Sequence, residues 1–171
     1  MRIPNTFNTV SEWNNLRWSE FTLSSCNKNR SYPLVAEGLS AEPGIYQMTW
    51  TNLSTWKKMN QHIEVDASPF IEDPTLDFSE TSLPLCLTVG KSVNLRNRIR
   101  QHFGFNENNN RVFKRLRSIT SPEMSDAELR DLARESVLIK TCVIESWVLR
   151  DIFESYAKAM FTPVFDLKAE R

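Results

Sequence analysis

The chain has 171 residues, with 21 lysines and arginines against 21 aspartates and glutamates, and its formal net charge is +0. This length suits one domain, and 40% hydrophobic with 25% charged residues is an ordinary composition for a globular protein. The balanced charge excludes the overall basic bias that is typical of non-specific nucleic-acid binders. Phosphate contacts would therefore require a local cluster of cations.

Cysteine and histidine are scarce, which limits the metal chemistry that the chain can support. Cys26, Cys86 and Cys142 are far apart and fit neither a disulfide framework nor a zinc ribbon. With only His62 and His102 to add, a Cys/His metal site is not expected. No apolar run approaches the length of a membrane span, and the first residues lack the order of a secretion signal. We expect a protein of the reducing cytoplasm that has no membrane partner.

Residues 1–42 are polar and predict an N-terminal arm with one helix. Ser11 can cap this helix, whose apolar side chains run from Trp13 to Phe21. The Pro43-Gly44 turn then precedes Ile45 to Trp50, which predicts a strand.

Residues 51–82 predict a surface insertion, because they are mostly polar or acidic and contain prolines. Within it, Leu53 to Ile63 suits a helix. Leu85 to Val89 is apolar and partly β-branched, which predicts a buried strand that ends at Gly90. A helix from Val93 to Phe103 should follow, since its apolar residues recur every four positions.

The second half of the chain predicts three helices and one strand. Residues 105–110 form a loop, and Arg111 to Ser118 form a helix with one basic face. Ser125 and Glu128 make a capping box for the next helix. Val137 to Ile144 is the clearest strand, and Ser146 to Met160 is a helix with a wide apolar stripe. The order strand, strand, helix, helix, helix, strand, helix indicates one α+β domain over residues 1–171.

The run Gly90-Lys91-Ser92 looks like the end of a phosphate-binding P-loop. That motif needs another glycine five residues before Gly90, so that the backbone can surround the phosphates. Position 85 is leucine, and nucleotide binding of this type is therefore not expected.

Taken with their neighbours, the same residues resemble the GIY-YIG nucleases. Gly44-Ile45-Tyr46 matches the first motif, and Val89-Gly90-Lys91 matches the end of the second. Arg98 lies eight residues after Gly90, and His102 lies four residues after Arg98, as in many members of the family. Glu154 on the last helix, twelve residues before Asp166, matches the distal glutamate. The resemblance covers about residues 43–167 and is strongest from Val89 to His102.

The resemblance implies a small antiparallel three-stranded sheet flanked by helices. The core would span residues 43–167, with the insertion 51–82 between its first two strands and the arm 1–42 before it. Two positions depart from the family pattern. Thr88 stands where the second tyrosine is usual, and Asp166 stands where asparagine is usual. The long insertion costs little, about 0.6 kcal/mol per doubling of loop length, but the missing hydroxyl implies either altered water positioning or a core that does not cut.

The resemblance also implies a role for each candidate catalytic residue. Glu154 would bind one divalent ion, Mg²⁺ or Mn²⁺, and Arg98 would neutralise phosphate oxygens. Tyr46 would orient or deprotonate the attacking water, which requires positive charge near it, and Lys91 is the candidate for that charge. His102 would relay a proton or bind the scissile phosphate.

Each of these residues also has an ordinary structural interpretation. Tyr46 alone suits a half-buried strand position, and Arg98 with His102 suits a solvated helix face. Glu154 lies four residues from both Arg150 and Lys158, which is typical of a surface ion-pair ladder. The functional interpretation depends on their joint occurrence, in the family's order and spacing.

We therefore expect a divalent-metal-dependent DNA endonuclease, most simply of restriction type and acting as a homodimer. A cationic patch would bind the DNA backbone; its members are Arg96, Arg100, Arg111, Lys114, Arg115 and Arg117. Two alternatives stay open. One is a catalytically impaired module that binds nucleic acid or protein, and the other is a repair nuclease that recognises branched DNA.

Overall fold

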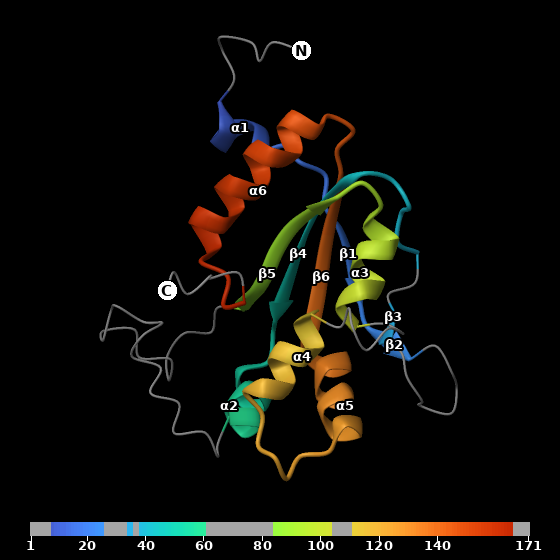
Figure 1. Cartoon of the computed structure of the whole chain (residues 1–171). Helices are drawn as coiled ribbons and strands as arrows, with labels where there is room; N and C mark the ends of the chain where they lie inside the picture. The colour runs from blue at the N-terminus through green and yellow to red at the C-terminus, as the bar shows by residue number, and fades with distance from the viewer. Residues whose placement is uncertain (1–7, 26–33, 36–37, 61–83, 104–110, 166–171) are drawn as a thin grey trace, which may run out of the picture.

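The computed structural model describes residues 8–25, 34–35, 38–60, 84–103 and 111–165 (Figure 1). The fold is α+β, as predicted, and its main sheet is antiparallel. The sheet has four strands in the order β1-β6-β4-β5. The strands are β1 (Ser19–Thr22), β4 (Gly44–Trp50), β5 (Leu85–Ser92) and β6 (Val137–Val143).

The prediction of a three-stranded sheet was wrong, because the N-terminal arm contributes β1. This strand pairs with the outer edge of β6, where Phe21 lies opposite Ile139. The predicted N-terminal helix is correspondingly shorter: α1 spans Thr9–Asn14, and the side chain of Asn8, rather than Ser11, caps it. With four residues, β1 is too short for its sequence to show an alternating apolar pattern. Its formation depends on its pairing with β6.

The second predicted strand does not end at Gly90 but continues to Ser92. Gly90 pairs with Tyr46 and Lys91 pairs with Ile45, so these residues belong to the sheet. Helix α3 (Leu95–Phe103) starts directly afterwards. Its first free backbone N–H groups, at Leu95 and Arg96, donate to carbonyls of the segment that leads into β4.

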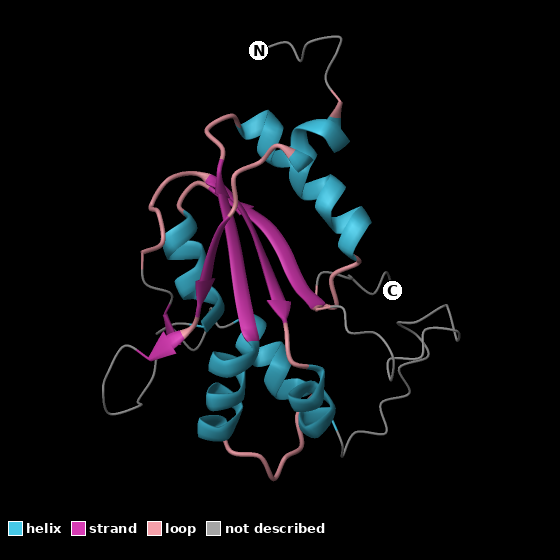
Figure 2. Cartoon of the chain, turned by 180° about the vertical axis from the view of Figure 1, so that it is seen from behind, coloured by secondary structure: helices cyan, strands magenta, loops and turns pink. Residues whose placement is uncertain are grey.

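Helices cover the two faces of the sheet unequally (Figure 2). Helix α3 lies along one face, and α4 (Arg111–Ser118) and α5 (Asp126–Ser136) gather at the end of the sheet where β6 begins; all three share a hydrophobic core with alternate residues of β4. The long helix α6 (Trp147–Phe161), with α1 beside it, covers the other face. Its Phe153 packs with Ile45 and Cys142.

The remaining described elements are small. Helix α2 (Leu53–Asn60) opens the predicted insertion, and β2 (Ser24–Ser25) pairs with β3 (Leu34–Val35) in a separate two-stranded sheet. The capping box that starts α5 is present as predicted. The rest of the insertion, the predicted loop at 105–110 and Asp166 lie outside the described residues. Within the described ranges, no helix is long and apolar enough to cross a membrane.

Candidate active site

Tyr46 is a buried residue of the central strand β4, with 2% of its surface exposed. Its ring lies over Gly90 of β5, and its hydroxyl shares a 2.8 Å hydrogen bond with Nε2 of His102. A methyl group added at Gly90 would lie 2.6 Å from Cζ of Tyr46, which is closer than carbon atoms can approach. Glycine at this position therefore makes room for the tyrosine.

Arg98 and His102 reach Tyr46 from the same side of helix α3, because residues four apart on a helix share one face. His102 is buried, and its ring centroid is 5.2 Å from that of Tyr46. Arg98 is half-buried; its Nε donates to the Tyr46 hydroxyl at 3.2 Å, and its Nη1 donates to Gln101 Oε1 at 3.3 Å. We call Tyr46, Arg98 and His102 the tyrosine triad. It extends from the core to the surface.

Lys91 and Glu154 meet on the other face of the sheet. Lys91 lies opposite Ile45, whose side chain packs under α6, whereas the neighbouring residue Tyr46 belongs to the core under α3. The Lys91 ammonium contacts Asp151 and, at 3.1 Å, Glu154 Oε2. Glu154 Oε1 also accepts a hydrogen bond from Lys158 at 2.9 Å. We call Asp151 and Glu154 the α6 carboxylate pair.

The five predicted catalytic residues therefore form two groups rather than one. The structure joins Tyr46, Arg98 and His102 as the resemblance implies, but it does not place Lys91 beside Tyr46. Successive side chains of a strand point to opposite faces, and Lys91 follows Gly90, which faces Tyr46. The positive charge next to the Tyr46 hydroxyl is the Arg98 guanidinium.

The charge of Lys91 is stabilised by its carboxylate partners. Hydrogen bonds to Asp151 first, and then to Glu154, raise the pKa of the Lys91 ammonium above its ordinary value, and a small desolvation effect acts in the opposite direction. Lys91 therefore carries a full positive charge at neutral pH.

The α6 carboxylate pair has the donor chemistry that a divalent ion needs. Mg²⁺ is typically held by one or two carboxylates together with substrate phosphates and water. The side chains of Asp151 and Glu154 are 47% and 16% exposed, so both can be reached from solvent. Lys91 and Lys158 together balance the charge of the pair, but exposed ion pairs contribute only about 0–1 kcal/mol and can be displaced. The residues present thus fit a divalent ion, although no cluster of three or more His, Cys, Asp or Glu occurs in the described residues.

Thr88, at the place of the second family tyrosine, is buried and lies opposite Met48 rather than Tyr46. It belongs to the same side of the sheet as the tyrosine triad, because Thr88 and Gly90 are two positions apart on β5.

The predicted cationic patch is only partly available for DNA. Arg96 donates from Nε to the Leu39 carbonyl at 2.8 Å, and Arg117 pairs with Asp126 at 3.2 Å. Arg96 is nevertheless exposed, as are Arg100, Lys114 and Arg115, whereas Arg117 is half-buried. Arg111 begins α4, but its side chain lies outside the described residues.

Sequence reasoning missed Asp151 and misassigned Arg150. Asp151 lies three residues before Glu154 on one helix face, and this spacing could have indicated the pair. Arg150 is buried and does not join an ion-pair ladder with Glu154. Its Nη1 donates to the carbonyls of Ile144 and Glu145 at 2.7 and 2.8 Å, which fixes the turn between β6 and α6.

Neither models of known protein families, nor curated protein sequences, nor solved protein structures gave a match to this chain. The resemblance to the GIY-YIG nucleases therefore rests on the residues and their spacing.

Proposed function

We propose that this chain is a divalent-metal-dependent DNA endonuclease with a GIY-YIG-type core. The observation that carries the proposal is the tyrosine triad. A strand tyrosine, a glycine beneath its ring, and an arginine and a histidine from the following helix are in direct contact.

The triad has the chemical groups that phosphodiester hydrolysis needs from a protein. Arg98 is the member that reaches solvent, and its planar guanidinium can neutralise the charge that develops on phosphate oxygens. His102 can accept the Tyr46 proton at Nε2, across their 2.8 Å hydrogen bond. The tyrosine oxygen, next to the Arg98 guanidinium, then serves to orient or deprotonate an attacking water. Because His102 is buried, relaying a proton suits it better than binding the scissile phosphate.

Asp151 and Glu154 would hold the divalent ion, Mg²⁺ or Mn²⁺, as neighbouring carboxylates on α6. When bound, the ion would supply positive charge to a phosphate on the α6 side of the sheet, across from the tyrosine triad. Lys91 would then give up its place between the two carboxylates. In this arrangement Lys91 regulates access to the pair and has no direct contact with Tyr46.

The proposal also specifies the substrate, the cellular location and the oligomeric state. We propose DNA as the partner, a cytoplasmic location and restriction-type cleavage by a homodimer, since palindromic sites favour twofold symmetry. The exposed residues Arg100, Lys114 and Arg115 support backbone contacts on the side of α3 and α4.

A catalytically impaired binding module is the second candidate, and a specific observation favours it. Both oxygens of Glu154 are neutralised by lysines, Lys91 at Oε2 and Lys158 at Oε1. Together with Thr88 in place of the second tyrosine, this arrangement would suit a core that binds but does not cut.

The test is incubation of the protein with supercoiled plasmid in Mg²⁺, in Mn²⁺ and in EDTA. The proposal predicts metal-dependent nicking that is lost in Glu154→Ala and retained in Glu145→Ala, an exposed glutamate before α6. Nicking that persists in EDTA or in Glu154→Ala would remove the metal assignment. DNA binding with no cutting under any condition would instead favour the impaired module.

A further inference from the structure

A cavity with a volume of about 410 Å³ lies where the N-terminal arm meets the end of β6. Its size falls in the range of about 300–1,000 Å³ that ligand-binding pockets have. Its wall is made by residues before β1, on β1 and β6, and in the segment that leads into β4. They include Arg17, Ser19, Phe21, Gly38, Ser40 and Thr141. None of the candidate catalytic residues lines this cavity, so it is a separate feature of the surface.

The cavity lies on the same face of the sheet as the tyrosine triad. Thr141 of β6 pairs with both Tyr46 of β4 and Ser19 of β1, so these three side chains leave the sheet on one face. Neighbouring strands are about 4.8 Å apart, which places Ser19 about 10 Å from Tyr46 and Thr141 between them. The cavity therefore begins one strand away from the candidate catalytic tyrosine.

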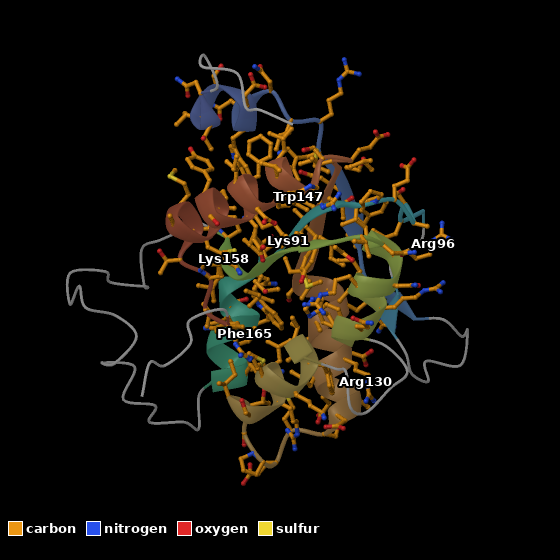
Figure 3. The ribbon with its side chains drawn as sticks, turned by 45° about the horizontal axis from the view of Figure 1, so that its top comes forward. Lys91, Arg96, Arg130, Trp147, Lys158 and Phe165 are labelled. Atoms are coloured by element: carbon orange, nitrogen blue, oxygen red, sulfur yellow. The ribbon has the colours of Figure 1, made fainter. Side chains whose placement is uncertain are left out.

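Helix α3 connects the wall of the cavity to the triad. The Leu39 carbonyl accepts a hydrogen bond from Nε of Arg96 at 2.8 Å, and the Ser40 carbonyl accepts one from the Arg96 backbone N–H at 2.9 Å. Ser40 itself lines the cavity. Figure 3 shows Arg96 at the beginning of α3, well apart from Lys158 on α6. The helix that carries Arg98 is thus fixed directly to the cavity wall.

The polar groups of the wall suit a phosphate. Arg17 is exposed and forms no ion pair with a carboxylate among the described residues. Thr141 is only 4% exposed, and its hydroxyl has no hydrogen-bond partner in the described part of the chain. A guanidinium and a hydroxyl both donate to phosphate oxygens, and a phosphate would satisfy this buried hydroxyl. Ser40 contributes less, because its hydroxyl already donates to the Glu42 carboxylate at 3.0 Å.

We propose that this cavity binds a phosphate of the DNA backbone close to the scissile one, with Arg17 and Thr141 as donors. The inference rests on the proposed endonuclease function and adds a binding subsite to it. In a duplex the phosphates lie on the outside of each strand, so one of them can enter a cavity while the bases stay paired. At 3.4 Å of axial rise per nucleotide, a separation of about 10 Å corresponds to about three nucleotides. The subsite therefore fixes the register of the strand on the triad without reading its sequence.

The first measurement is binding of a blunt duplex by fluorescence anisotropy at several salt concentrations, without divalent ions. Arg17→Ala should weaken binding about tenfold at low salt. It should also lower the slope of log affinity against log salt by about 0.9, the value for one phosphate contact. Arg17→Lys should keep most of the slope, because the charge remains. Lys58→Ala is the matched control, because Lys58 is an exposed cation on α2, which follows the other end of β4.

Thr141 gives a second test, which a general effect of charge would not pass. Thr141→Val keeps the shape of the side chain and removes the hydroxyl, so duplex binding should weaken about 2- to 12-fold. Because this hydrogen bond involves no charge on the protein, the loss should be equal at low and high salt. Thermal unfolding of each variant measures whether its fold is retained.

Ethylation interference then locates the subsite on the DNA. With a lightly ethylated, end-labelled duplex, nicking in Mg²⁺ should be blocked at the scissile phosphate and at a second phosphate within about three nucleotides of it. The second block should be absent for Arg17→Ala. Interference at the scissile phosphate alone would contradict the inference.

The outcomes separate this inference from the endonuclease proposal. An unchanged salt slope in Arg17→Ala, or equal losses in Arg17→Ala and Lys58→Ala, would overturn the inference and leave the endonuclease proposal intact. A reduced slope in Arg17→Ala with full binding by Thr141→Val would place the contact outside the cavity, which also overturns it. Duplex binding with the expected changes but no nicking would support the subsite and contradict the endonuclease proposal. No duplex binding by the intact protein would overturn both.

Discussion

At the residue scale, the candidate active site is organised around the hydroxyl group of Tyr46. It receives a hydrogen bond from Arg98 and shares another with His102, although Tyr46 is almost fully buried. Burying polar atoms in this way costs free energy unless all of them find partners. The partners here are two ionisable side chains, Arg98 and His102.

We predict that Tyr46→Phe lowers the free energy of unfolding by about 1–3 kcal/mol, because the buried His102 nitrogen loses its partner. The same change should leave the secondary structure intact and abolish nicking. Urea unfolding followed by circular dichroism measures the first effect. Unchanged stability would mean that the hydrogen bond between Tyr46 and His102 is not formed in solution.

Lys91 provides the second residue-scale prediction. Replacing Lys91 by methionine removes the ammonium group that contacts both Asp151 and Glu154, so a divalent ion no longer competes with it. We expect Lys91→Met to bind Mn²⁺ several-fold more tightly, as measured by electron paramagnetic resonance of the free ion. Lys140→Met is the control, because Lys140 pairs with Glu20 at 2.7 Å on a different strand pair. Equal or weaker Mn²⁺ binding by Lys91→Met would contradict this role.

The sequence was sufficient to bring Arg98 and His102 together, because a spacing of four on an amphipathic helix leaves little choice of direction. It was not sufficient for Lys91. The second strand was expected to end at Gly90, which placed Lys91 in a turn that could bend toward Tyr46. The strand continues to Ser92, and its alternation then turns Lys91 to the opposite face. One error in an element boundary therefore misplaced one candidate residue.

At the element scale, the pairing of β4 with β5 fixes the position of Tyr46. The two strands place Tyr46 opposite Gly90 in a register set by the long antiparallel ladder from Gly44 to Trp50. The same ladder joins residues separated by the entire insertion. The Pro43-Gly44 turn predicted the first strand and an apolar, partly β-branched run predicted the second, whereas β1 was missed because its existence depends on the edge that β6 offers.

We predict that Gly90→Ala destabilises the fold by about 1–3 kcal/mol and displaces the tyrosine ring, because the new methyl group would overlap Tyr46. Nicking should fall sharply while the sheet is retained. Val93→Ala, an exposed change three residues later, should affect neither property. Thermal unfolding and plasmid nicking measured on the same samples check both effects. Full activity of Gly90→Ala would show that the position of the ring is not important.

At the scale of the whole molecule, the neutral net charge conceals an uneven surface. The helices after β5 carry Arg100, Lys114 and Arg115 as exposed cations with no carboxylate paired to them among the described residues, while Asp151 and Glu154 on α6 are paired with Lys91 and Lys158. The chain composition could exclude a uniformly basic protein, but it could not show this separation. The separation arises from the fold, which places α6 on one face of the sheet, and α3 on the other with α4 next to it.

We predict that the double variant Lys114→Ala/Arg115→Ala weakens duplex binding and reduces the slope of log affinity against log salt by about 2, or roughly 0.9 for each lost phosphate contact. Arg117→Ala should leave the slope unchanged, because Arg117 is engaged with Asp126 and the Ser121 carbonyl. Anisotropy titrations at several salt concentrations measure the slope. A slope that is the same in the double variant would place the DNA elsewhere.

The central claim is that the tyrosine triad cuts DNA, and two arginines of helix α3 test it most directly. Arg98 contacts the Tyr46 hydroxyl, while Arg100, two residues later, is exposed. The measurement is the rate of supercoiled-plasmid nicking in Mg²⁺ by Arg98→Ala and by Arg100→Ala, at equal concentrations of folded protein. We predict a loss of about 10²- to 10³-fold for Arg98→Ala and only a salt-dependent weakening of DNA binding for Arg100→Ala. Equal rates in the two variants would contradict the claim.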